Sequence, residues 1–154
     1  MTTILEAKAS LRANFEEGVK CPCCGQRVQE YRRKLTSSMA HGLIAAYNWH
    51  IRNPDKEWFH VSEFDLSAFR GGDFAKVKLW NLALEMPNPN DPTKRSSGMW
   101  KLSESGKMFV RNEINVPKYV YIYDNKVTRK SEEITDIMMA LGDKFNYSEL
   151  MEGR

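Results

Sequence analysis

The sequence of 154 residues predicts an α+β fold organised around a helix-turn-helix. Two apolar runs, residues 62–69 and 74–86, flank a Gly-Gly pair at 71–72, and glycine turns a chain between two helices without a steric penalty. Aromatic and β-branched runs typical of strands follow at residues 99–102 and 119–123. Helices followed by strands in this order indicate a mixed fold with antiparallel sheets.

The composition allows one main domain and excludes several classes of protein. With 42% hydrophobic residues, a chain of this length can bury a core. The net charge of +3 is unevenly distributed, because residues 101–130 carry +4 and residues 131–154 carry −4. The absence of a secretory signal and of an apolar run of about 18 residues predicts a cytoplasmic protein that does not engage a membrane. Three cysteines within four positions do not suit a disulfide framework.

The N-terminal segment, residues 1–35, is predicted to be a helix, a cysteine turn and a second helix. Apolar residues recur at helical spacing on both sides of the turn, over 3–17 and 28–35. Cys21 and Cys24 have the C-x-x-C spacing of a zinc knuckle. A structural zinc needs four ligands, so the intervening cysteine or a histidine could complete the shell, or two chains of a homodimer could share the metal. The alternative is a turn that binds no metal.

Three helices are predicted in the centre of the chain. The first spans residues 39–51, with Thr36 and the serines after it as caps. The second and third are the two runs of the helix-turn-helix, and Asp73 is expected to cap the third. On a helical wheel the third helix offers a narrow polar arc of Lys78, Asn81 and Glu85, with Lys76 elsewhere, and is apolar nearly all round, a pattern typical of a buried helix. It could therefore lie in a core or a protein interface as well as on DNA.

A loop and a short helix are predicted next. Residues 86–98 hold three prolines and should project Lys94 and Arg95 from the scaffold. This loop is either a solvated connector or a phosphate-contacting loop. The strand at 99–102 leads into a helical turn over 103–110 that its first serine caps.

A hairpin follows, with strands at residues 119–123 and 126–129 around a two-residue turn. Lys118, Lys126 and Arg129 lie on or beside it. Three tyrosines alternate along the first strand. Such a face packs in a core more commonly than it stacks on bases, and both interpretations stay open.

The run Trp100-Lys-Leu-Ser-x-x-Gly-x-x-Phe109, coming after three helices, resembles the winged-helix proteins. The resemblance covers about residues 37–129. It implies a winged helix-turn-helix domain over 36–130, in which the predicted hairpin is the wing. A C-terminal docking helix, capped by Ser131, and a tail are predicted over 131–154. The Cys-Pro-x-Cys-Gly start and the tail also resemble small bacteriophage-encoded accessory proteins.

We therefore predict a non-catalytic DNA-binding protein of bacteriophage type, with a regulatory or accessory role such as transcription regulation and double-stranded DNA as its partner. The residues expected to contact DNA are Arg70, Lys76, Lys78, Asn81, Lys94, Arg95, Lys118, Lys126 and Arg129. The alternative is a protein–protein interaction module on the same scaffold, for instance an inhibitor or adaptor of a host factor. No nucleophile motif accompanies the three histidines, so an enzyme is not expected.

Overall fold

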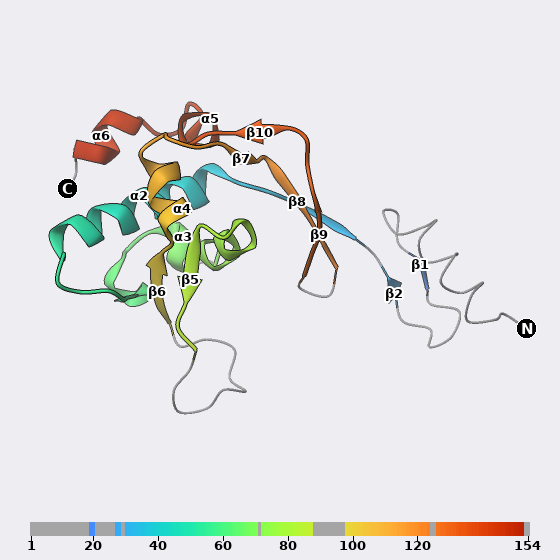
Figure 1. Ribbon diagram of the computed structural model, residues 1–154, viewed down its shortest axis with the longest axis horizontal. Helices are drawn as coiled ribbons and strands as arrows, with labels where there is room; N and C mark the ends of the chain where they lie inside the picture. The colour runs from blue at the N-terminus through green and yellow to red at the C-terminus, as the bar shows by residue number, and fades with distance from the viewer. Residues whose placement is uncertain are drawn as a thin grey trace, which may run out of the picture. The chain divides into compact units, whose positions relative to one another are not determined.

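The computed structural model describes residues 19–20, 27–28, 30–70, 72–87, 98–123 and 126–152 (Figure 1). Contacts divide the chain into a smaller unit, residues 1–34 with 119–131, and a larger unit, residues 35–118 with 132–154. The larger unit combines helices with short antiparallel strands, which confirms the α+β class. The contacts group the hairpin with the N-terminal residues, whereas the sequence placed it in the central segment.

The core of the larger unit is built on α2 (Ser37–Arg52), which confirms the helix predicted over 39–51. Thr36 caps this helix, since its hydroxyl accepts a hydrogen bond of 3.2 Å from the backbone N–H of Met39. The apolar stripe of the helix includes Leu43 and Ile44, both fully buried. The helix is thus held by a cap at one end and by burial along one face.

Against this helix lies a small antiparallel sheet of β4 (Phe59–His60), β6 (Met99–Leu102) and β5 (Ala83–Glu85), in the order β4-β6-β5. The central strand β6 confirms the strand predicted over 99–102, and its burial alternates, with Trp100 and Leu102 buried and Met99 and Lys101 partly exposed. Strands β4 and β5 are far apart in sequence and both pair with β6, so the chain between them must fold over the sheet.

That connection contains three short helices: η1 (Val61–Glu63), α3 (Ser67–Arg70) and η2 (Phe74–Trp80). The predicted helix over 74–86 is therefore wrong beyond residue 80. Asn81 adopts a left-handed conformation with φ of 60°, which asparagine tolerates better than most residues, and the chain then enters β5. Burial of Leu82 and pairing with β6 outweigh continuation of the helix.

The predicted cap at Asp73 is also absent, because its side chain makes no capping hydrogen bond. It instead lies 3.7 Å from the ammonium of Lys76, three residues further along η2. The predicted helix over 62–69 is replaced by the two short helices η1 and α3.

The helix after β6, α4 (Glu104–Val110), confirms the predicted helical turn. The Ser103 hydroxyl caps it by accepting a hydrogen bond of 3.0 Å from the backbone N–H of Gly106. A Cβ added to Gly106 would lie 1.9 Å from the carbonyl oxygen of Leu82, so a larger residue cannot fit without moving backbone. The serine and glycine of the Trp-Lys-Leu-Ser-x-x-Gly run thus serve to seat α4 against the start of β5.

The C-terminal part of the larger unit departs from the predicted helix starting at Ser131. Strand β10 (Ile134–Thr135) comes first and pairs with β7 (Val116–Pro117), before α5 (Ile137–Leu141) and α6 (Tyr147–Glu152). The N-cap is Asp136, whose carboxylate accepts a hydrogen bond of 2.8 Å from Met139. Pairing across the chain has overridden the local helical pattern. Among the described helices, none is long and apolar enough to span a membrane.

The described residues of the smaller unit form two antiparallel sheets. Strands β1 (Val19–Lys20) and β2 (Arg27–Val28) pair with each other, and a second sheet has the order β3 (Tyr31–Lys34), β8 (Tyr119–Tyr123), β9 (Lys126–Lys130). The predicted hairpin is confirmed as β8 and β9. The predicted helix over 28–35 is wrong, because β3 forms an antiparallel ladder with β8. The predicted helix over 3–17 lies outside the described residues.

Candidate nucleic-acid interface

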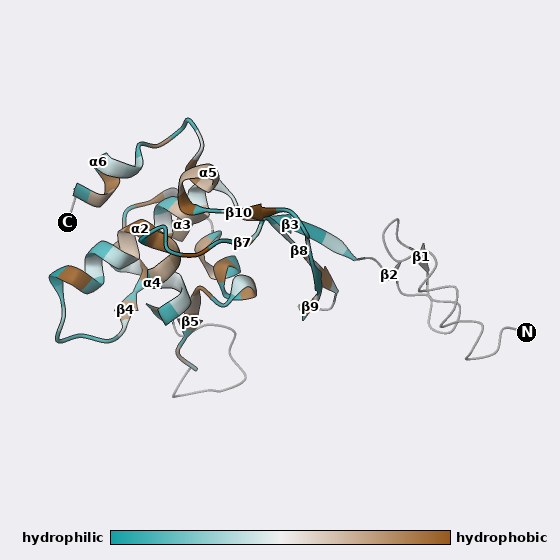
Figure 2. Cartoon of the chain, turned by 45° about the horizontal axis from the view of Figure 1, so that its top comes forward, coloured by the Kyte–Doolittle hydropathy of each residue, from teal (hydrophilic) through white to brown (hydrophobic). Residues whose placement is uncertain are grey.

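The smaller unit carries a net positive charge. Its residues, 1–34 and 119–131, include ten lysines and arginines and five acids. The three strands β3, β8 and β9 contribute six of these cations and no acid, and β3 is coloured hydrophilic in Figure 2. Positive charge gathered on one small sheet is the electrostatic pattern of a nucleic-acid-binding surface.

The register of this sheet sorts its side chains onto two faces. In antiparallel pairs, residues directly opposite each other project from the same face. Tyr121 lies opposite Arg32 on one side and Arg129 on the other. The same rule applied to the neighbouring pairs gives one face of alternating aromatic and cationic residues, which we call the tyrosine-basic face: Arg32, Lys34, Tyr119, Tyr121, Tyr123, Lys126 and Arg129.

Two arginines on the tyrosine-basic face lie over tyrosine rings. The guanidinium carbon of Arg129 is 3.8 Å from the centroid of Tyr121, and that of Arg32 is 4.5 Å from the centroid of Tyr119. These distances suit cation–π contacts. Each pair therefore presents a guanidinium group held against an aromatic ring.

Glu30 holds Arg129 in place from the side of the sheet. Its Oε1 accepts a hydrogen bond of 3.0 Å from Nε of Arg129 and forms an ion pair with Nη2 at 2.9 Å, and Oε2 accepts a hydrogen bond from the Thr128 hydroxyl. Only 4% of the Glu30 side chain is exposed. The β-bulge between Tyr121 and Ile122 accommodates Thr128, so the strand irregularity helps to bring the three side chains together.

The sequence predicted Lys126 and Arg129 on this surface but missed Arg32, Lys34 and Glu30. The helical spacing of Val28, Tyr31 and Leu35 predicts a helix over 28–35, whereas β3 is a strand that pairs with β8. The alternation of the tyrosines was the available signal, because it indicates a two-residue period for the sheet.

The other predicted contact residues with described side chains lie in the larger unit, and each lysine there has an acidic neighbour. Lys76 is 3.7 Å from Asp73, Lys78 is 3.9 Å from Glu85, and Lys118 is 3.3 Å from Glu133. Asn81 is exposed at the end of η2, where its backbone carbonyl accepts a hydrogen bond of 2.6 Å from Ser103. The side chain of Arg70, and both Lys94 and Arg95, lie outside the described parts of the chain.

The predicted metal ligands Cys21 and Cys24 also lie outside the described residues. Within the described ranges, no group of three or more His, Cys, Asp or Glu residues could hold a metal ion. The three histidines are engaged elsewhere. His41 contacts the ring of Phe145, His50 accepts a hydrogen bond from Leu102, and His60 accepts one from Ser62.

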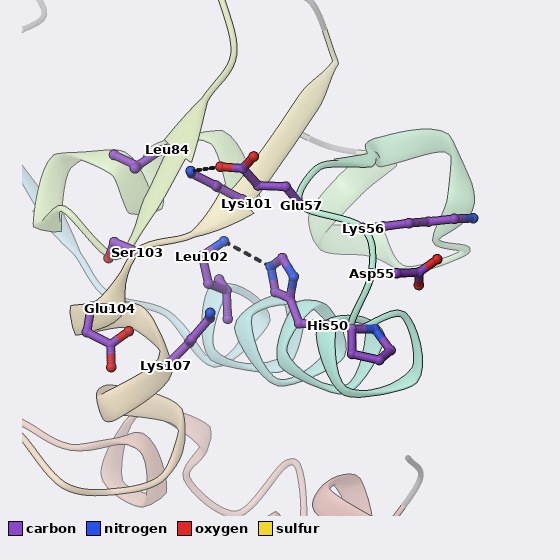
Figure 3. A pocket seen from close by; sticks show the side chains of 11 residues that line it. His50, Asp55, Lys56, Glu57, Leu84, Lys101, Leu102, Ser103, Glu104 and Lys107 are labelled. Carbon is purple, nitrogen blue, oxygen red and sulfur yellow. Dashed lines mark hydrogen bonds and ion pairs between the residues drawn. The ribbon is translucent and has the colours of Figure 1, made fainter.

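A second candidate site is an open pocket of about 530 Å³ in the larger unit (Figure 3). Burial and then the charges of Lys107 and Lys101 lower the pKa of His50 to about 4. Its neutral ring accepts a hydrogen bond of 3.2 Å from the Leu102 N–H, and Lys101 pairs with Glu57. Three lysines and three acids line the pocket, so it concentrates no net charge. The arrangement suits structural support more than ligand binding.

A third feature is apolar. Three hydrophobic side chains on β10 and α5 are more than half exposed: Ile134, Met138 and Met139. Figure 2 shows the hydrophobic colour of β10. Exposed apolar groups this close in sequence are a candidate protein contact.

Comparison with known proteins gives no guide to these surfaces, since no family model, curated protein or solved structure was found to match the chain.

Proposed function

We propose that this protein binds DNA without catalysing a reaction, in a regulatory or accessory role of the bacteriophage type. The observation that carries the proposal is the charge of the sheet of β3, β8 and β9, whose strands hold six cations and no acid. Glu30, which precedes β3, is neutralised by Arg129. The remaining cations have no comparable acid in the described part of this unit, which favours a polyanionic partner.

The tyrosine-basic face supplies the phosphate contacts in this proposal. Arg32, Lys34 and Lys126 are exposed and stand on one side of a three-stranded sheet. Each phosphate that such a residue neutralises releases counterions. At about 0.1 M salt this release raises the affinity about 8-fold per contact. Three contacts therefore account for roughly 500-fold of binding that is independent of base sequence.

We further propose that the larger unit is a winged-helix domain. The support is its order of elements, in which η2 is followed by two antiparallel strands and the sheet order is β4-β6-β5. In this assignment the wing is the connection between β5 and β6, which contains Lys94 and Arg95, and not the hairpin of β8 and β9. Element η2, with Lys76 and Lys78, then stands in the place of a recognition helix.

Binding of DNA by η2 requires its lysines to exchange acidic partners for phosphates. Lys78 and Glu85 are 3.9 Å apart, and more than half of the lysine side chain is exposed. An exposed ion pair of this kind contributes about 0–1 kcal/mol, so breaking it costs little. Asn81 is the amide side chain nearest to these lysines in sequence and would read a base edge.

The test is binding of a fluorescently labelled 20-base-pair duplex at 100 mM salt. Replacing Arg32 and Lys126 with alanine together should weaken binding about 60-fold, as two lost phosphate contacts require. Lys144→Ala removes one positive charge from an exposed position in the larger unit and should leave the affinity unchanged. Equal affinities for the double variant and the unmodified protein would refute the proposed surface.

A protein-interaction module is the second candidate function, and the exposed apolar residues of β10 and α5 favour it. Met138 and Met139 are 53% and 64% exposed. A partner that covers them, either a host protein or a second copy of the chain, would remove this apolar area from water. Sedimentation of the Met139→Lys variant tests the second-copy version, because a dimer formed through this patch should dissociate.

A further inference from the structure

We infer that the tyrosine-basic face binds single-stranded nucleic acid, with bases stacked on its aromatic and guanidinium groups and the backbone following its cations. This inference rests on the proposed function and names the form of nucleic acid that the smaller unit takes. It concerns only the sheet of β3, β8 and β9.

The spacing of the tyrosines favours a single strand over a duplex. Tyr119, Tyr121 and Tyr123 occupy every second position of β8 and share one face. Alternate residues of a strand are about 6.8 Å apart. Stacked bases in a duplex are about 3.4 Å apart, so successive tyrosines match bases that have been separated from one another. Separated bases stacked on aromatic side chains are the usual mode of single-strand recognition.

The stacking surfaces differ in how open they are. Tyr123 is 40% exposed, and the guanidinium groups of Arg32 and Arg129 lie over the rings of Tyr119 and Tyr121. A guanidinium plane is itself a stacking surface for bases. The face therefore offers the ring of Tyr123 and the two arginine–tyrosine pairs.

The Arg129–Tyr121 pair is already ordered before a ligand binds. Glu30 fixes the guanidinium through a hydrogen bond of 3.0 Å and an ion pair of 2.9 Å, and the ring centroid of Tyr121 lies 3.8 Å from the guanidinium carbon. Binding to a fixed group loses less side-chain entropy than binding to a free arginine. Glu30 thus holds Arg129 in a position where a base can stack on it. Because its carboxylate is paired with Arg129, it does not repel phosphate.

The charges on the same face fit the backbone of the strand. Lys34 and Lys126 are exposed and flank the tyrosines on the two outer strands. Glu30 is the acid that contacts this face; its side chain is 4% exposed and paired with Arg129, so it presents no free charge to a phosphate. A surface that combines cations with aromatic rings suits a ligand that has both phosphates and bases, whereas an acidic protein supplies negative charge without bases.

The test compares a labelled 15-nucleotide oligothymidylate, an oligouridylate of the same length and a 15-base-pair duplex, all at 50 mM salt with the full chain. We expect the single strands to bind more tightly than the duplex. Tyr123→Leu keeps an apolar side chain on the strand but removes the aromatic ring, and should weaken single-strand binding about 10-fold while leaving duplex binding unchanged. Preference between the two single strands shows whether DNA or RNA is the better ligand.

Tyr31→Leu is the matched control. Tyr31 is 54% exposed on β3 of the same sheet, but it lies opposite Ile122 and therefore on the other face. The Tyr31→Leu variant should bind the single strands and the duplex as the unmodified protein does. Thermal melting of each variant shows whether the sheet remains folded.

The outcomes separate this inference from the proposed function. If none of the nucleic acids binds at 50 mM salt, the proposed function fails and the inference fails with it. If the duplex binds as tightly as the single strands and Tyr123→Leu changes neither, the inference is overturned while the proposed function stands. Displacement of the single strand by polyglutamate at equal charge concentration would also overturn it, since the tyrosines would then contribute nothing.

Discussion

Replacing Gly106 with alanine perturbs the contact that seats α4 against β5. The added Cβ would lie 1.9 Å from the carbonyl oxygen of Leu82 and 2.9 Å from its carbonyl carbon. Both atoms are backbone, and the same oxygen accepts a hydrogen bond of 3.1 Å from the Ser103 N–H, so relief requires α4 to move. Overpacking of this severity costs about 3–4 kcal/mol, and the better helix propensity of alanine returns about 1. The expected net loss of stability is about 2–3 kcal/mol.

Urea and thermal unfolding, followed by tryptophan fluorescence, measure this loss. For a chain of this size it corresponds to a fall in melting temperature of about 5–10 °C. Ser105→Ala is the matched control, because it changes the adjacent, exposed position in the same helix and should alter stability by less than about 0.5 kcal/mol. A Gly106→Ala protein that melts at or above the temperature of the unmodified protein would refute the packing of α4 against Leu82.

Two other predictions concern pH and metal. The pKa of His50 is lowered to about 4 in the folded chain, and an unfolded histidine titrates near 6.5, so the unfolded state binds more protons between these values. Stability should therefore fall as the pH decreases from 7.5 to 4.5, by about 1–2 kcal/mol from this group once its partial exposure is allowed for. The His50→Gln variant keeps an acceptor for the Leu102 N–H. In urea unfolding its stability should fall by about 1–2 kcal/mol less over this pH range than that of the unmodified protein. An identical pH dependence in the two proteins would contradict the lowered pKa of His50. If Cys21 and Cys24 bind zinc, elemental analysis should find the metal in purified protein and Cys24→Ser should lose it; metal-free protein that is fully folded under reducing conditions would exclude a structural zinc.

Local signals in the sequence were sufficient for some elements. Thr36 and Ser103 start α2 and α4 where a capping residue precedes an apolar periodic run. The alternation of β6, and the aromatic run of β8 followed by a turn, predicted strands correctly. In each case the information lies within one element and its immediate flanks.

The errors occurred where pairing between distant residues decided the structure. Residues 83–85 continue a helical pattern, but their partners are on β6 and the left-handed Asn81 redirects the chain toward them. Residues 31–34 also fit a helical spacing, yet they pair with residues 119–122. A single sequence does not reveal such partners, since either pattern is compatible with the local residues.

The candidate site was predicted in part for the same reason. Lys126 and Arg129 were found because the hairpin that carries them is local. Arg32 and Lys34 join them only through the pairing of β3 with β8, and Glu30 meets Arg129 across 99 positions of the chain. The tyrosines were visible in the sequence, but their arrangement with the arginines depends on the register.

The salt dependence of nucleic-acid binding tests the central claim most directly. For the 20-base-pair duplex, three to four phosphate contacts predict a slope of log affinity against log salt between about −2.7 and −3.6. The double variant of Arg32→Ala and Lys126→Ala should flatten this slope by about 1.8, whereas Lys144→Ala should not change it. A slope near zero, or the same slope in the double variant as in the unmodified protein, would contradict phosphate binding by the tyrosine-basic face.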